Sequence, residues 1–64
     1  MNGEYIKCKR EEKGWSQRRL GDEVGVSQNM IHYIETNQRI PSLAVANALA
    51  KALGCKVDDF INFT

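Results

Sequence analysis

A tight bend between two short helical patterns is the feature that most constrains this chain. Leu20 and Val24 are four residues apart, so they share one face of a short helix. Ile31 and Ile34 are three residues apart and define the inward face of a second short helix. Gly25 lies between the two patterns, where it can end the first helix in a left-handed conformation without a Cβ penalty. Because the connection is so short, the two helices are expected to cross steeply.

The residues of the bend predict a helix-turn-helix. Val26 lies in the bend, and the Ser27 hydroxyl can cap the second helix, which we expect over residues 28–36. A turn this short makes the second helix stand out from the surface. Residues 17–35 are therefore the part of the chain that the rest is expected to support and present.

The sequence before the bend predicts two helices. Residues 3–13 form the first, with Asn2 as its N-terminal cap and Gly14 where it stops. Residues 17–24 form the second, and Ser16 caps it.

Trp15 and Gly21 are assigned to packing. Trp15 is expected to cover the corner between the first two helices, and stacking on a nucleic-acid base is the alternative. Gly21 lies between Leu20 and Val24, so another helix can approach closely there. The alternative is that Gly21 is only a weak helix former, at a cost of about 1 kcal/mol relative to Ala.

The sequence after the bend predicts a fourth helix and a short fifth element. Asn37 can adopt the left-handed conformation that ends the helix of residues 28–36. Ser42 then caps a helix that Gly54 ends, and its apolar residues recur with a period of 3.6: Leu43, Ala46, Leu49, Ala50 and Leu53. A last element is expected over residues 57–62. No segment has a strand pattern, so the chain predicts one all-α domain, a compact bundle of about five short helices.

Two charged residues fall on the expected inward faces. Arg10 is four residues from Ile6 and shares its face. Glu35 shares the face of Ile31 and Ile34. Because a buried charge needs a partner, we predict that Arg10 pairs with Glu35. The alternative is that both side chains extend to water.

The charge distribution restricts the function classes. The formal net charge is +1, with a balance of +3 over residues 1–19 and −2 over the remainder. The strongly basic surface that supports tight nucleic-acid binding is therefore missing from the composition.

The few reactive side chains favour neither a metal site nor catalysis. Cys8, Cys55 and His32 have no metal-ligand spacing, and no catalytic constellation is present. We therefore expect no enzyme activity, no metal, no cofactor and no small-molecule substrate, and we expect both thiols to be free, small, buried side chains. No apolar run is long enough to form a signal peptide or to cross a membrane, so we expect a cytoplasmic protein.

An ordered set of short motifs extends over nearly the whole chain. They are Arg10-Glu11-Glu12-Lys13-Gly14, Ser16-Gln17 followed by Leu20-Gly21, Val24-Gly25-Val26-Ser27-Gln28, Ile34-Glu35, Pro41-Ser42-Leu43 and Leu49-Ala50-Lys51-Ala52-Leu53-Gly54. With this set the chain resembles, over residues 6–61, the helix-turn-helix family of lambdoid phage repressors and Cro proteins, which includes many small bacterial regulators of the xenobiotic-response-element type. The resemblance implies a lambda-repressor-like domain that binds an operator in double-stranded DNA and regulates transcription, as a repressor rather than an activator.

The chain departs from this family at three places. Thr36, Asn37 and Gln38 stand in a turn where members often have glycine or a basic residue, and Ile40 replaces a commonly polar loop residue. Lys56 stands where Ser or Thr usually caps the last helix, so fraying of that element is expected.

The start of the protruding helix carries the candidates for base recognition. Gln28 and Asn29 have carboxamides, which can bond bidentately to adenine N6 and N7 in the major groove. A polar, solvent-facing turn is the alternative. One turn later, His32 and Tyr33 are expected to point outward. Tyr33 can contact a thymine methyl or a phosphate, whereas His32 is either a donor to DNA or an ordinary surface imidazole, and Met30 can touch DNA or fill the seam with the preceding helix.

Candidate phosphate contacts flank that helix. Gln17 is at the N-terminus of the preceding helix, where free N–H groups and the helix dipole favour an anion, and the resemblance also implies a phosphate contact there. The other predicted phosphate contacts are Arg18, Ser27, Asn37, Gln38 and Arg39.

One module of this size makes few DNA contacts, so we expect a homodimer on a two-fold site with half-sites about one helical turn apart. The residues expected at the dimer contact are Ile40, Phe60, Ile61 and Phe63. The alternative function is an antitoxin or a similar protein-binding module whose DNA binding is autoregulatory. Such a module would expose a larger apolar patch around residues 60–63.

Overall fold

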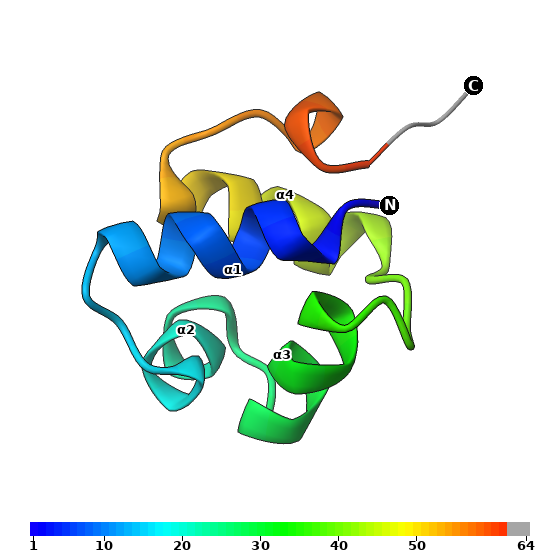
Figure 1. Ribbon diagram of the computed structural model, residues 1–64. Coiled ribbons are helices and arrows are strands. Elements are labelled where there is room, and N and C mark those ends of the chain that lie inside the picture. The colour runs from blue at the N-terminus through cyan, green and yellow to red at the C-terminus, as the bar shows by residue number, and fades with distance from the viewer. Residues whose placement is uncertain (62–64) are drawn as a thin grey trace.

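The computed structural model describes residues 1–61, which form four α-helices and one turn of 3-10 helix (Figure 1). The elements are α1 (Gly3–Glu12), α2 (Gln17–Val24), α3 (Gln28–Glu35), α4 (Leu43–Leu53) and the 3-10 turn η1 (Val57–Asp59). In Figure 1, α2 and α3 lie together on one side of α1, and η1 lies on the other. None of the helices in this part of the chain is both long enough and apolar enough to cross a bilayer.

The predicted helix starts and the predicted turn are confirmed. Each predicted cap accepts a hydrogen bond from the backbone N–H three residues further on: Asn2, Ser16, Ser27 and Ser42. Gly25 has φ of 81° and ends α2 in the left-handed conformation. Asn37 has φ of 62° and does the same after α3. Local side-chain chemistry therefore determines where the helices begin and how the chain leaves them.

The predicted fifth helix is wrong in extent. Residues 57–59 form a single 3-10 turn, and Asn62 lies outside the described residues. The carboxylate of Asp59 accepts a hydrogen bond from the Lys56 backbone N–H at 2.9 Å, so the cap comes from inside the turn. Helices α1 and α3 each end one residue earlier than predicted, because Lys13 and Thr36 are their C-caps.

The core lies where the four helices meet, and most of its members were predicted. The buried apolar side chains are Ile6, Leu20, Ile31, Ile34, Ala46, Leu49, Ala50, Leu53, Phe60 and Ile61. Leu43 was assigned to the buried stripe of α4, but it is 62% exposed. It is the first residue of α4, and the core begins only one turn later, at Ala46.

The two cysteines are free, as predicted, but Cys8 is exposed and not buried. It lies two residues after Ile6, about 200° around α1 from the buried face. Cys55 is half-buried beside the core, and burial raises the pKa of its thiol.

Two glycines allow close backbone contacts. A Cβ on Gly21 would lie 2.6 Å from the carbonyl oxygen of Val26, so the turn between α2 and α3, and not another helix as predicted, approaches there. A Cβ on Gly3 would lie 2.6 Å from the carbonyl oxygen of Glu35, and the Gly3 N–H donates to Asn37 Oδ1 at 2.9 Å. The start of α1 is therefore packed directly on the end of α3, a contact that the sequence did not indicate.

The predicted pair of Arg10 and Glu35 is confirmed and is bidentate. Arg10 Nε lies 2.7 Å from Glu35 Oε2, and Nη2 lies 3.1 Å from Oε1. The hydrogen bond to Glu35 raises the pKa of Arg10 above its usual value. Arg10 and Glu35 are 8% and 6% exposed, so neither side chain reaches freely into water.

Two further hydrogen bonds extend this pair into a network that joins three helices. Arg10 Nη1 donates to the carbonyl oxygen of Trp15 at 2.7 Å, and Gln17 Nε2 donates to Glu35 Oε1 at 3.1 Å. Trp15 is half-buried against the core, as predicted, and the cations of Lys13 and Arg19 lie 5.1 and 4.8 Å from its ring centroid. The network therefore fixes the end of α3 against the start of α2.

Arg10→Met should lower the free energy of unfolding by about 3–5 kcal/mol, because it leaves the Glu35 carboxylate buried without its cation. Urea denaturation followed by circular dichroism measures this loss. The double variant Arg10→Met/Glu35→Leu is the control, and it should recover most of the stability because no charge is left buried. An Arg10→Met variant as stable as the parent would contradict the structural role of the pair.

Gln17→Ala should lower the free energy of unfolding by about 1 kcal/mol in the absence of DNA, because the carboxylate of Glu35 loses a hydrogen bond. Arg18→Ala is the matched control, since Arg18 is an exposed residue on the same turn. Its stability should stay within about 0.5 kcal/mol of the parent. Equal stabilities for the two variants would show that the Gln17 hydrogen bond contributes nothing to the fold.

Candidate nucleic-acid interface

The outward face of α3 holds all four predicted base-recognition residues. Ile31 and Ile34 are completely buried, which fixes the rotation of α3 about its axis. The exposed side chains on the opposite side are those of Gln28, Asn29, His32 and Tyr33. Residues four apart lie one above the other on a helix, so these four form a single surface two turns long.

The start of α3 is free to pair with another molecule. Ser27 Oγ accepts the hydrogen bond from Met30 N at 3.1 Å, which leaves its own proton available to a second acceptor. Within residues 1–61, the carboxamides of Gln28 and Asn29 form no hydrogen bond. Each of them keeps both its donor and its acceptor for a partner outside the chain.

The N-terminus of α2 lies beside this face and combines structural and binding groups. The backbone N–H groups of Gln17 and Arg18 belong to the first turn, so they have no partner inside the helix. The Gln17 carboxamide was expected to be free for DNA, but one of its two N–H groups is donated to Glu35. The second N–H group and the two backbone donors can still bind an anion.

The loop after α3 is held by hydrogen bonds to the helix end. Thr36 Oγ1 donates to the carbonyl oxygen of His32 at 2.9 Å, and Gln38 Nε2 donates to Thr36 Oγ1 at 2.8 Å. Asn37 Oδ1 is already used by the N–H of Gly3. The predicted phosphate contacts of this loop are therefore brought close to α3, with Asn37 partly committed to the fold.

Positive charge is scarce around this surface. Arg39 is the one Lys or Arg between residues 20 and 50. On α2, Arg19 Nε is paired with Glu23 Oε1 at 2.9 Å, whereas Arg18 is exposed. Arg18 at the start of α2 and Arg39 after α3 are exposed cations near this face, and the exposed Lys7 of α1 lines a hollow together with His32 and Thr36.

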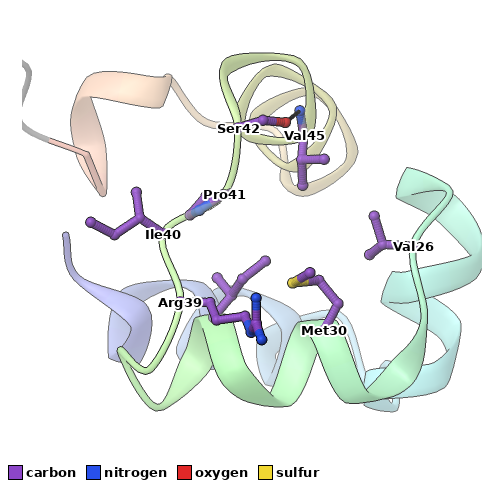
Figure 2. Close-up of a pocket in the computed structure, with 8 residues that line it drawn as sticks. Val26, Met30, Arg39, Ile40, Pro41, Ser42 and Val45 are labelled. Atoms are coloured by element: carbon purple, nitrogen blue, oxygen red, sulfur yellow. Dashed lines mark hydrogen bonds between the residues drawn. The ribbon is translucent and has the colours of Figure 1, made fainter.

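A groove of about 300 Å³ lies between α3, the following loop and the start of α4 (Figure 2). Figure 2 shows Met30 and Val45 facing each other across it, with Val26 at one end. The full lining is Val26, Met30, Ile34, Arg39, Ile40, Pro41, Ser42 and Val45. Met30 is half-buried here, so it lies on the side of α3 and not on the outward face.

The predicted dimer contact needs correction. Phe60 and Ile61 are 2% and 7% exposed and belong to the core, while Phe63 lies outside the described residues. Ile40 is 77% exposed, as a contact residue should be. Leu43, three residues further on, is exposed as well. The exposed apolar patch expected of an antitoxin is also missing at residues 60 and 61.

A helix-turn-helix family model matches residues 6–60 of the chain. YgzD of Bacillus subtilis (strain 168), an uncharacterized HTH-type transcriptional regulator, is 39% identical over 46 residues, which are 72% of this chain and 70% of YgzD. The HTH-type transcriptional regulator SutR of Escherichia coli (strain K12) is 35% identical over 57 residues, which are 89% of this chain but only 32% of SutR.

The likeness extends to a solved protein–DNA complex. The P22 c2 repressor protein bound to a synthetic operator superimposes with a TM-score of 0.86 and 38% identity, over 88% of this chain and 85% of the repressor chain. The family model covers most of the chain, and the fold agrees with it. The chain therefore belongs to the helix-turn-helix family of lambdoid phage repressors and Cro proteins.

Proposed function

We propose that this chain is a sequence-specific double-stranded DNA-binding protein that regulates transcription as a repressor, with α3 in the major groove. The observation that carries this proposal is the exposure of the unpaired carboxamides of Gln28 and Asn29 at the start of a helix whose inward face is locked by Ile31 and Ile34. The similarity to the operator-bound P22 c2 repressor supports it.

The surrounding residues divide into base contacts and phosphate contacts. Gln28 and Asn29 lie where a recognition helix first meets base edges, and His32 and Tyr33 follow one turn later. The proposed phosphate contacts come from the start of α2, with Gln17 and Arg18, from the N-cap of α3, Ser27, and from the loop after α3, with Asn37, Gln38 and Arg39. Phosphate contacts position the protein, and base contacts provide the specificity.

Selection of bound sequences from a pool of random duplexes tests the proposal directly. We expect enrichment of a two-fold symmetric site whose half-sites lie about one helical turn apart. Enrichment of no common sequence, with equal binding to all duplexes, would contradict sequence-specific recognition.

Gln28→Ala should keep the fold and cost about 1–3 kcal/mol of binding free energy at one base pair of the selected site. Binding to a set of duplexes with single base-pair changes, followed by fluorescence anisotropy, locates that position. Asn47→Ala removes an exposed carboxamide from α4 and is the control, with binding expected to equal that of the parent. Equal weakening of Gln28→Ala on every duplex would remove Gln28 from base recognition.

We further propose that two copies bind the two half-sites and touch through Ile40 and Leu43. These two aliphatic side chains are 77% and 62% exposed. They lie within four residues of each other, and no charged side chain occurs in residues 40–50. Depletion of charge around exposed aliphatic residues is typical of homodimer contacts.

Leu43→Asp should weaken binding to a duplex with two half-sites while leaving binding to a single half-site unchanged. A symmetric contact would bring two carboxylates together, whereas an aspartate at the start of α4 is favourable for the helix itself. Sedimentation velocity with and without the duplex measures the stoichiometry, and Cys8→Asp, which places an aspartate at an exposed position of α1, is the control. A parent protein that binds as a monomer at high micromolar concentration would exclude the dimer.

A further inference from the structure

We propose that Tyr33 acts on DNA through Arg39: its carbonyl oxygen and its ring hold the loop after α3, so that the guanidinium of Arg39 is fixed next to the recognition helix for a phosphate contact. This inference rests on the proposed DNA binding. It changes the role of Tyr33 from a base-recognition residue to a positioning residue.

The carbonyl oxygen of Tyr33 anchors the backbone of the loop. The N–H of Gln38 donates to it at 2.8 Å, and the N–H of Arg39 donates to it at 3.2 Å. The Thr36 hydroxyl lies 3.3 Å from the same oxygen. Two backbone donors, those of Gln38 and Arg39, thus meet at one acceptor, and the backbone of Arg39 is tied to the last turn of α3.

The ring of Tyr33 holds the side chain of the same arginine. The Arg39 Cζ atom lies 5.6 Å from the ring centroid, within the range of a cation–π interaction. None of the ion pairs formed within residues 1–61 includes Arg39. Figure 2 shows the Arg39 side chain turned back from the loop toward α3. The aromatic face is therefore the protein group that orients this guanidinium.

This arrangement has a consequence for what Tyr33 can do on DNA. The ring face that carries the guanidinium is covered, so it does not pack on a thymine methyl group. A guanidinium over an aromatic ring keeps its N–H groups at the edge free to donate to a phosphate. Tyr33 then contributes to binding on every sequence, and only while Arg39 is present.

A double-mutant cycle on the selected duplex and on a random-sequence duplex tests this coupling. Tyr33→Leu should weaken binding about two- to fivefold on both duplexes, as expected for the loss of an exposed cation–π pair. Arg39→Ala should reduce the slope of log K against log salt by about 0.9, the value for one phosphate. In the Arg39→Ala background, Tyr33→Leu should have no further effect. Tyr33→Phe keeps the ring, so its coupling to Arg39 in the same cycle should equal that of the parent tyrosine.

Two outcomes would overturn the inference. One is an effect of Tyr33→Leu that is confined to a single base pair, and the other is an effect that persists in the Arg39→Ala background. Loss of binding in Tyr33→Phe would assign the contact to the phenolic hydroxyl instead. Thermal unfolding of each variant shows whether the fold is kept.

A measurement without DNA separates this inference from the proposed function. The ring should shift the Arg39 side-chain proton resonances upfield in the parent and in Tyr33→Phe, but not in Tyr33→Leu. Arg39 resonances at the same positions in the parent and in Tyr33→Leu would reject the stacked arrangement whatever the protein binds. If the parent protein binds no duplex, the proposed function and this inference are rejected together. If it binds a specific sequence but the effects of Tyr33→Leu and Arg39→Ala are independent, only the inference is rejected.

Discussion

The buried pair of Arg10 and Glu35 is the interaction on which the geometry of the proposed interface depends. Glu35 is the last residue of α3, Arg10 lies in the last turn of α1, and Gln17 joins them from the first residue of α2. A buried ion pair contributes little net stability compared with an apolar replacement, but it is costly to break. Its effect here is geometric, because it fixes the recognition helix relative to the helix that would bind the phosphate backbone.

Much of the fold could be predicted because neighbouring signals agree with one another. Each of three helices begins directly after a capping serine: Ser16, Ser27 or Ser42. The chain leaves α2 and α3 through residues in the left-handed conformation, Gly25 and Asn37. The ion pair could be predicted as well, since two charges placed on apolar faces have few ways to be satisfied. Such inferences depend on residues close together in sequence, or on a strict requirement for a partner.

Other features depend on packing that the sequence does not encode locally. Leu43 and Phe60 are both apolar, yet one is exposed and the other is buried, because only the second has elements packed over it. Gly3 carries no signal of its close contact with the end of α3. At the candidate site, the residue types and the exposed face could be predicted, but not the hydrogen bonds that commit Gln17 and Asn37 to the fold.

The scarcity of positive charge around α3 bears on how such a protein would find its site. Non-specific affinity for DNA comes from phosphate neutralisation by Lys and Arg, and the exposed cations near the recognition helix are few: Lys7, Arg18 and Arg39. A protein with few such contacts leaves non-cognate DNA quickly and is less titrated by the large excess of competing sites in a genome. Occupancy of an operator would then be decided by the ratio of cognate to non-cognate affinity and by the copy number of the protein, more than by tight binding of a single copy.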